Sequence, residues 1–163
     1  MKSSTKKDVL QSLRTRNPEK LIISHLNINS LRNKFEFLIP LVRENIDIMM
    51  LSETKLDASF PQAQFQIEGY SRPYRLDRNQ NGGGIILYVR EDIPSKLLKS
   101  TLNSEKYECL LVEINLRKRK WLIICNYNPH KTSITDYLKY VSKEIDFQLS
   151  KYENVLLLGD FNS

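Results

Sequence analysis

The sequence is poor in cysteine, histidine and glycine, and it has no long apolar run. Its 163 residues include two cysteines, two histidines and five glycines. No stretch approaches the roughly 20 apolar residues that a membrane-spanning helix needs, and the polar N-terminus leads into no apolar segment of signal-peptide type. We therefore expect no membrane partner and an intracellular location, with the nucleus as a compatible compartment.

The few cysteines and histidines form no recognisable metal-binding or redox motif. Cys109 and Cys125 lie inside apolar runs, which predicts buried thiols rather than a disulfide or a zinc site. His25 lies in the first apolar run and is interpreted as a strand or core residue, whereas His130 directly follows Pro129 and is interpreted as a loop residue. Zinc and thiol chemistry are therefore not favoured.

Positive charge is in excess, with a formal net charge of +6 at neutral pH. Such a charge suits a polyanionic partner, because contacts to phosphate dominate the affinity of proteins for nucleic acids. The basic residues concentrate in the first 20 positions and in the Arg-Lys-Arg-Lys run at 117–120. That run lies between two strand-like segments, so a solvated hairpin turn is favoured over a phosphate clamp or a nuclear-import signal.

The apolar pattern predicts one α/β domain. Residues 1–19 are polar and charged and are interpreted as a leader or a short helix outside the core, so that the domain extends over residues 20–163. Short runs rich in Ile, Val and Leu predict strands, and they lie at residues 21–26, 46–51, 84–89, 109–116, 121–127 and 155–158. The consecutive strands from 84 to 127 are expected to pair antiparallel in one mixed sheet, since a tight basic turn joins the last two.

Two segments have the period of amphipathic helices instead. Apolar residues between 31 and 42 share one face, after Ser30 as the expected N-cap and with Pro40 expected to kink or shorten the helix. A longer stripe over residues 134–149 follows Ser133, and Asp136 completes the pattern of a capping box. Strands interleaved with helices favour the α/β class.

Oxygen-bearing side chains stand at the ends of four strand-like runs. They are Asn27, Glu53, Asn126 with Tyr127, and Asp160 with Asn162. If the runs lie side by side, these groups converge at one edge, where ligand sites of α/β sheets are found. The alternative is that each Asn or Asp only ends its strand and caps a turn.

Carboxylates and amides are hard ligands, which suit Mg²⁺ better than zinc. Mg²⁺ takes one or two protein carboxylates and leaves its other positions to water and phosphate, so Glu53 can hold it alone. Asp160 could then orient or deprotonate an attacking water, and the amides of Asn27 and Asn162 could bind phosphate oxygens without adding negative charge.

Four short motifs in order carry a family resemblance. They are Leu-Asn-Ile-Asn-Ser-Leu-Arg (26–32), Ser-Glu-Thr-Lys (52–55), Tyr-Asn-Pro (127–129) and Gly-Asp-Phe-Asn (159–162). Together they resemble successive motifs of the endonuclease/exonuclease/phosphatase superfamily. Residues 74–78 and 81–90 are similar to the apurinic-type endonuclease domains of non-LTR retrotransposons.

This resemblance implies a fold, an ion and a set of roles. The fold would be part of a four-layer α/β sandwich, in which helices flank two mixed β-sheets. Glu53 would bind Mg²⁺, or Mn²⁺ as an alternative, with Asn27 as its partner. Tyr127 would contact the phosphate, Asp160 would position or activate the nucleophilic water, and Asn162 would support the phosphoryl group. The implied activity is a metal-dependent cut at DNA backbone phosphates.

The sequence also departs from the family pattern. Asn29 stands where repair enzymes of the superfamily often have an aspartate. The family's Asp-His motif, expected after further strands, has no counterpart before Ser163, so we expect a domain that lacks its C-terminal segment and is inactive in isolation. Two alternatives remain open: a phosphatase of the same superfamily, and a catalytically inactive remnant that binds nucleic acid.

Overall fold

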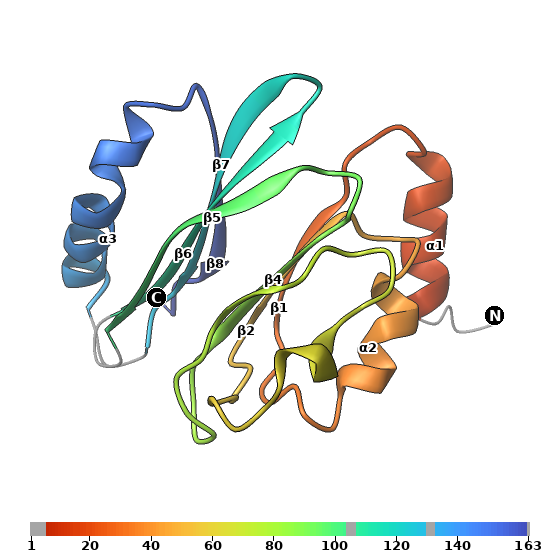
Figure 1. Cartoon of the computed structure of the whole chain (residues 1–163), viewed down its shortest axis with the longest axis horizontal. Helices are drawn as coiled ribbons and strands as arrows, with labels where there is room; N and C mark the ends of the chain where they lie inside the picture. The colour runs from red at the N-terminus through yellow and green to blue at the C-terminus, as the bar shows by residue number, and fades with distance from the viewer. Residues whose placement is uncertain (1–5, 104–106, 130–132, 163) are drawn as a thin grey trace.

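Two sheets of four strands each pack face to face in the computed structural model, which describes residues 6–103, 107–129 and 133–162 (Figure 1). The first sheet has the order β1-β2-β4-β3 and comprises β1 (Ile23–Asn27), β2 (Ile48–Ser52), β3 (Tyr74–Leu76) and β4 (Ile85–Val89). The second has the order β5-β6-β7-β8 and comprises β5 (Ser95–Asn103), β6 (Tyr107–Leu116), β7 (Arg119–Tyr127) and β8 (Asn154–Asp160).

Each sheet is mixed, and each carries its parallel pair at one edge. Strands β1 and β2 are parallel, as are β7 and β8, whereas the other neighbouring strands are antiparallel. Because parallel strands end at the same side, the carboxyl ends of β1 and β2 lie together, and so do those of β7 and β8. The sandwich brings these two edges into contact.

Helices cover both outer faces and complete four layers, which confirms the predicted fold class (Figure 1). Helices α1 (Lys6–Arg16) and α2 (Phe35–Val42) lie outside the first sheet, and α3 (Ile134–Leu149) lies outside the second. A short 3-10 helix, η1 (Gln62–Phe65), follows β2. No helix in the described ranges is long and apolar enough to cross a membrane.

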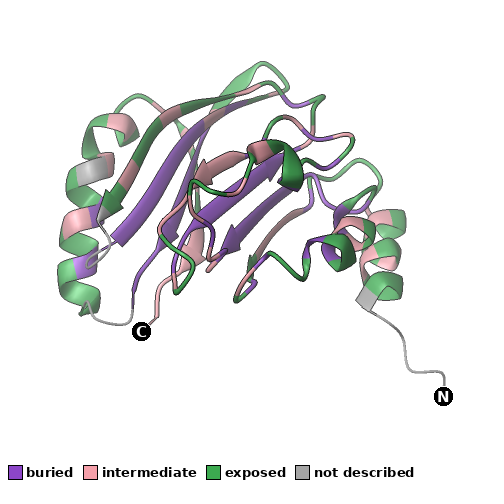
Figure 2. Cartoon of the chain, turned by 60° about the horizontal axis from the view of Figure 1, so that its bottom comes forward, coloured by how far each residue is buried: buried purple, intermediate pink, exposed green. Residues whose placement is uncertain are grey.

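Apolar side chains fill three interfaces between these layers. One core lies between the two sheets, a second lies under α2, and a third lies under α3. Figure 2 shows the buried strands enclosed by helices whose outer faces are exposed. Strands buried on both faces form from continuous apolar runs, which is why the strand signal in the sequence was strong.

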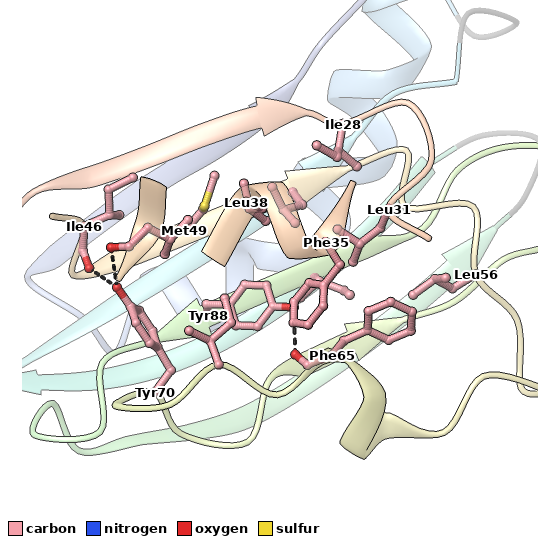
Figure 3. Close-up of a cluster of buried hydrophobic side chains, with 14 of the residues drawn as sticks. Ile28, Leu31, Phe35, Leu38, Ile46, Met49, Leu56, Phe65, Tyr70 and Tyr88 are labelled. Atoms are coloured by element: carbon pink, nitrogen blue, oxygen red, sulfur yellow. Dashed lines mark hydrogen bonds between the residues drawn. The ribbon is translucent and has the colours of Figure 1, made fainter. Parts of the chain in front are cut away.

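The core under α2 anchors the loops that lead to the strand ends. Leu31 follows β1, Leu56 follows β2, and both are fully buried in this core (Figure 3). The hydroxyl of Tyr88 donates to the carbonyl of Phe65 at 2.9 Å, and that of Tyr70 donates to the carbonyls of Val42 and Ile46. Buried tyrosines with satisfied hydroxyls therefore tie the loops to the first sheet.

The first predicted helix starts later than expected. Helix α2 begins at Phe35, and its N-cap is Lys34, which makes no side-chain cap, rather than Ser30. The backbone N–H groups of Ser30 and Leu31 instead donate to the carbonyls of Glu53 and Thr54, at 2.8 and 3.0 Å. These long-range bonds hold the segment as a loop. Pro40 lies inside the helix, which ends at Val42.

The sheet assignment of one strand was also wrong. Strand β4 pairs with β2 and β3 in the first sheet, whereas β6 and β7 form a hairpin in the second. Strands β3 and β5 were not predicted, because β3 has three residues and β5 is largely polar. The register of β6 and β7 ends at the pair Leu116 and Arg119, which confirms the basic hairpin turn.

Several local predictions are confirmed. Cys109 and Cys125 are buried free thiols. The hydroxyl of Ser133 accepts from the backbone N–H of Asp136 at 3.2 Å, as expected of an N-cap. His25 lies in β1, whereas His130 lies outside the described residues.

The polar N-terminal region contains a helix that contacts the first sheet. The guanidinium of Arg14 in α1 donates to Asp47 Oδ2 at 2.6 Å, and Leu10 packs against the core under α2. Asp47 is buried just before β2 and also accepts from Arg90 and from the backbone N–H of Ile22. A buried carboxylate with several donors thus fastens α1 to the sheet.

Candidate active site

The strand ends that the sequence singled out meet across the two sheets. Asn27 ends β1 and donates through Nδ2 to Oδ2 of Asp160, which ends β8, at 2.9 Å. Tyr127 ends β7 and donates through its hydroxyl to Oε1 of Glu53, which follows β2, at 2.6 Å. The groups therefore converge at one end of the sandwich, paired between sheets rather than along one sheet edge.

Glu53 occupies a strained and tightly held position. Its φ is 56°, in the left-handed region that side chains with a Cβ rarely adopt. Two hydrogen bonds hold the peptide group between Glu53 and Thr54. The carbonyl of Glu53 accepts from the N–H of Ser30, and the N–H of Thr54 donates to the carbonyl of Gly84 at 3.3 Å. Backbone strain of this kind costs about 1–3 kcal/mol, persists only where the surroundings impose it, and clusters at functional sites.

Lys55 lies beside the carboxylate and donates to the side chain of Asn29. Its Nζ is 3.8 Å from Oε2 of Glu53 and donates to Oδ1 of Asn29 at 2.6 Å. The backbone N–H of Asn29 in turn donates to Oδ1 of Asn27 at 3.1 Å. Asn29 therefore bridges the lysine and Asn27 as a neutral acceptor, without a second negative charge near Glu53.

Asp160 is held by donors on both carboxylate oxygens. Oδ2 accepts from the side chain of Asn27, and Oδ1 accepts from the backbone N–H of Asn162 at 3.3 Å. Its own carbonyl accepts from the N–H of Asn128 at 2.9 Å, and it stands opposite Tyr127 in the β7–β8 register. The orientation of the carboxylate is thus fixed by the sheet and by two hydrogen bonds.

The two amides near the ends of β7 and β8 differ in what they contact. Asn162 donates through Nδ2 to the carbonyl of Asn128 at 2.5 Å, so one of its two amide hydrogens faces the backbone. Asn126 is fully buried, and neither of its side-chain polar atoms has a hydrogen-bond partner among the residues that the structure describes. Because Cys125 and Tyr127 belong to the core between the sheets, alternation turns Asn126 toward the α3 layer, away from Glu53.

The local environment keeps the tyrosine and the histidine neutral. Burial, followed by the hydrogen bond to Glu53, raises the pKa of Tyr127, so its hydroxyl remains a donor. Burial lowers the pKa of His25, an effect that the charge of Asp160 opposes. The ring Nε2 of His25 lies 3.0 Å from Oγ of Ser52, which makes His25 a strand residue that contacts its neighbouring strand.

One buried acid near these groups was missed by the sequence reasoning. Glu108 lies directly opposite Tyr127 in the β6–β7 register and has no exposed surface. The signal was present, because a glutamate interrupts the apolar run Tyr-Glu-Cys-Leu-Leu at 107–111. A charged residue in a buried strand requires partners and is therefore informative.

The donor set fits a hard, oxygen-loving cation better than a soft one. No group of three or more His, Cys, Asp or Glu that could hold a metal occurs among the residues that the structure describes. Mg²⁺ does not need such a group, since one carboxylate with waters and substrate phosphate completes its shell. Glu53 is partly exposed and lies near Lys55, and it is the carboxylate suited to that role.

Comparisons with known proteins bear on the family and the fold of the chain. A sequence model described as the Endonuclease/Exonuclease/phosphatase family matches residues 24–163. Among curated proteins no match was found.

Solved structures share the fold at low sequence identity. TDP2 of D. rerio, complexed with a single-strand DNA product, has a TM-score of 0.64 and 17% identity over 89% of this chain and 62% of its own. The endonuclease domain of TRAS1, a telomere-specific non-LTR retrotransposon, has a TM-score of 0.62 and 14% identity over 88% and 60%. A mannosyl-6-phosphatase of Bacteroides thetaiotaomicron has a TM-score of 0.65 and 13% identity over 88% and 66%. The chain thus spans less than two thirds of each of these structures.

Proposed function

Because the chain belongs to the endonuclease/exonuclease/phosphatase family, we propose that the convergent strand ends form the metal-binding and water-binding part of a DNA endonuclease site of the non-LTR retrotransposon type. The observation that carries the proposal is the pair of hydrogen bonds across the sheets, Asn27 to Asp160 and Tyr127 to Glu53. They bring a carboxylate suited to a cation next to a carboxylate suited to water.

Glu53 is the residue that would hold Mg²⁺, with Mn²⁺ as an alternative. When bound, the ion supplies charge neutralisation at the attacked phosphate. The protein contributes the position of the carboxylate. The backbone of Glu53 is held by the loop after β1, the backbone of Thr54 is held by Gly84, and Oε1 is oriented by the Tyr127 hydroxyl.

Asp160 is the group proposed to orient the attacking water and to accept its proton. The side chain of Asn27 and the backbone N–H of Asn162 hold its two oxygens in place. A general base must lie within hydrogen-bond reach of the proton that it takes, and a fixed carboxylate meets that requirement without reorganisation. Each of its oxygens can accept further hydrogen bonds, so a water can bind beside the existing donors.

Amide and hydroxyl donors would contact the phosphate oxygens. Asn27 and Asn162 each use one Nδ2 hydrogen in the structure and keep a second. The Tyr127 hydroxyl donates its single hydrogen to Glu53 in the structure, so it would contact a phosphate oxygen by turning that hydrogen away from the carboxylate. Donors of this kind stabilise the charge that develops on the phosphoryl oxygens and add no repulsion.

DNA is the proposed substrate because cations border the site. Lys55 lies beside Glu53, and Lys34 donates to the carbonyls of Ile28 and Asn29 in the neighbouring loop. The net charge of +6 has the sign that a phosphate backbone attracts. The resemblance of residues 74–78 and 81–90 to retrotransposon endonuclease domains supports the retrotransposon type, and the TRAS1 domain is one structure that shares the fold.

Nicking of supercoiled plasmid and binding of Mn²⁺ followed by electron paramagnetic resonance test the proposal together. Glu53→Gln should weaken Mn²⁺ binding at least about tenfold and abolish any nicking. Asp160→Asn should abolish nicking while retaining most of the Mn²⁺ affinity. Glu113→Gln is the matched control, because that carboxylate lies at the far end of β6 and contacts Lys96 and Tyr152.

Three results distinguish the alternatives. Hydrolysis of phosphomonoesters with no action on DNA would favour a phosphatase of the same family. Salt-sensitive DNA binding without Mn²⁺ binding or cleavage would favour an inactive nucleic-acid-binding remnant. Mn²⁺ binding that depends on Glu53, without nicking by the isolated chain, is the result that we expect. Nicking that depends on both carboxylates would show that the residues present suffice for cleavage.

A further inference from the structure

Glu108 is a fully buried carboxylate that lies beside the site without reaching into it. It stands opposite Tyr127 on the neighbouring strand, so both side chains leave the sheet on the same face, toward the first sheet. Its Oε2 accepts from the backbone N–H of Gly84 at 2.7 Å, and its Oε1 accepts from the guanidinium of Arg78 at 3.1 Å. The carboxylate of a second-sheet strand therefore holds the loop that leads into β4 of the first sheet.

The turn at Gly83 and Gly84 is shaped to receive this carboxylate. Both glycines have positive φ values, 69° and 91°. A Cβ on Gly83 would lie 2.2 Å from Oε1 of Glu108, and a Cβ on Gly84 would lie 2.3 Å from Oγ1 of Thr54. Side chains are thus excluded because Glu108 and Thr54 pack directly against the turn.

The same turn supports the backbone that follows Glu53. The carbonyl of Gly84 accepts from the N–H of Thr54 at 3.3 Å, and the carbonyl of Gly83 accepts from the N–H of Lys55 at 3.0 Å. Glu53 and Lys55 have left-handed φ values of 56° and 54°. Two bonds from the glycine turn therefore hold the strained segment in place.

The buried charge of Glu108 depends on its contacts with Arg78 and Gly84. Burial raises the pKa of Glu108, whereas the Gly84 N–H and the Arg78 guanidinium favour the charged form. Removing one member of a buried ion pair leaves an uncompensated charge, which is strongly unfavourable. The side chain of Arg78 is 20% exposed, so it can move outward if Glu108 loses its charge.

We infer that Glu108 and Arg78 form a partly buried ion pair that positions Glu53 through the glycine turn at residues 82–84. The inference rests on the proposed function, because it assigns this pair to the site in which Glu53 binds the cation. Glu108 touches neither substrate nor ion and acts as a positioning residue. Arg78 orients its carboxylate, and the carbonyls of Gly84 and Gly83 transmit that orientation to the N–H groups of Thr54 and Lys55, respectively.

Two measurements on the whole chain test this inference. Mn²⁺ affinity is followed by electron paramagnetic resonance, and amide hydrogen exchange is followed at Thr54, Lys55 and Gly84. In Glu108→Gln and in Arg78→Met we expect Mn²⁺ binding to weaken about 10- to 100-fold, as for other residues that orient a metal ligand. Exchange at the three amides should accelerate. Arg78→Lys keeps the cation and should recover part of both losses.

Asp47→Asn separates positioning from a general loss of stability. Like Glu108, Asp47 is a buried carboxylate paired with arginine, but it lies at the opposite end of β2 from Glu53. The Asp47→Asn substitution should lower the melting temperature without changing Mn²⁺ affinity or exchange at Thr54 and Lys55. If Asp47→Asn weakens Mn²⁺ binding as much as Glu108→Gln does, the positioning role is overturned.

The outcomes also separate this inference from the proposed function. If the unaltered chain binds no Mn²⁺, the proposed metal site fails, and exchange at Thr54 and Lys55 alone decides whether Glu108 positions the loop. If the chain binds Mn²⁺ and Glu108→Gln changes neither affinity nor exchange, the inference fails and the metal site stands. The inference is supported if Glu108→Gln loses both Mn²⁺ affinity and protection from exchange at Thr54 and Lys55 while Asp47→Asn retains them.

Discussion

The two halves of the candidate site are built in different ways. The half from the first sheet, Asn27 and Glu53, lies where β1 and β2 pass into loops, and left-handed φ values occur there at Asn29, Ser30, Glu53 and Lys55. The half from the second sheet, Tyr127 and Asp160, lies in regular strands that stand opposite each other in a parallel register. One half depends on loop contacts and the other on strand pairing.

The two proposed carboxylates therefore differ in the backbone that carries them, which is regular at Asp160 and strained at Glu53. Strand pairing fixes the backbone of Tyr127 and Asp160 in ordinary geometry, and hydrogen bonds from Asn27 and Asn162 then orient the proposed water-binding carboxylate. The proposed metal-binding carboxylate stands on a strained backbone that contacts from Ser30 and Gly84 maintain. Changes to the second half should therefore act through the stability of the sheet, and changes to the first through the position of Glu53.

The largest expected effect comes from breaking the close approach of β7 and β8. A Cβ on Gly159 would lie 2.2 Å from the carbonyl oxygen of Asn126. Backbone cannot yield as a side chain can, so Gly159→Ala should lower the free energy of unfolding by about 3 kcal/mol or more. Urea unfolding measures this loss of stability. Gly69→Ala is the control, because nothing lies within 4 Å of the Cβ that it adds and only the positive φ opposes the substitution. An equally large loss of stability in Gly69→Ala would contradict the steric explanation for Gly159.

Cutting one contact between the halves should have a moderate effect. Tyr127→Phe removes the hydroxyl that donates to Glu53 and keeps the buried ring. We expect a loss of about 1–2 kcal/mol in the free energy of unfolding, since a buried hydrogen bond to a carboxylate is lost. Thermal or urea unfolding checks this value. Tyr152→Phe removes a similar hydrogen bond to Glu113 from a less buried tyrosine, so it should lower the free energy of unfolding by a smaller amount. Equal losses in the two variants would show that burial does not set the strength of these hydrogen bonds.

Relieving backbone strain far from the candidate site should stabilise the protein without changing the site. Arg117 and Lys118 form the β6–β7 turn with φ values of 49° and 65°. Asn-Gly suits such a turn, so Arg117→Asn with Lys118→Gly should raise the free energy of unfolding by about 1 kcal/mol. Mn²⁺ affinity should stay unchanged, in contrast to changes near Glu53. A shift in affinity would mean that the turn communicates with the site.

The smallest expected effect is the dependence of stability on pH through His25. Burial lowers its pKa in the folded state, so the unfolded chain binds more protons below its usual value of 6.5. Stability is then fully present above about pH 6.5 and declines as the pH falls toward the folded-state pKa. Melting temperatures between pH 5 and 8 should show this slope, and His25→Gln should flatten it. An unchanged slope in the variant would assign it to other groups.

Local patterns in the sequence predicted most of the secondary structure and all the strand ends of the site. The runs around β2, β6 and β7 were found because continuous apolar residues are needed for strands buried on both faces. Helix α3 was found because its stripe and its Ser133 cap agree. Strand β5 was missed because an edge strand with many polar residues carries no such signal.

The wrong start of α2 and the wrong sheet for β4 share one physical cause. Helix α2 starts at Phe35 because the preceding residues form backbone bonds to Glu53 and Thr54, and β4 joins β2 rather than β6. Both outcomes depend on partners far along the chain. Neither the period of a segment nor its cap contains that information, because long-range pairing overrides local preference.

By itself, the sequence determined the four motifs, the alternation of strands and helices, and the residue types that suit a hard cation. Only the tertiary structure decided that Asn27 meets Asp160, that Tyr127 meets Glu53, and that Glu108 supports the turn behind them. The reason is that chain neighbours set local conformation, whereas the packing of two sheets decides which strand ends face each other.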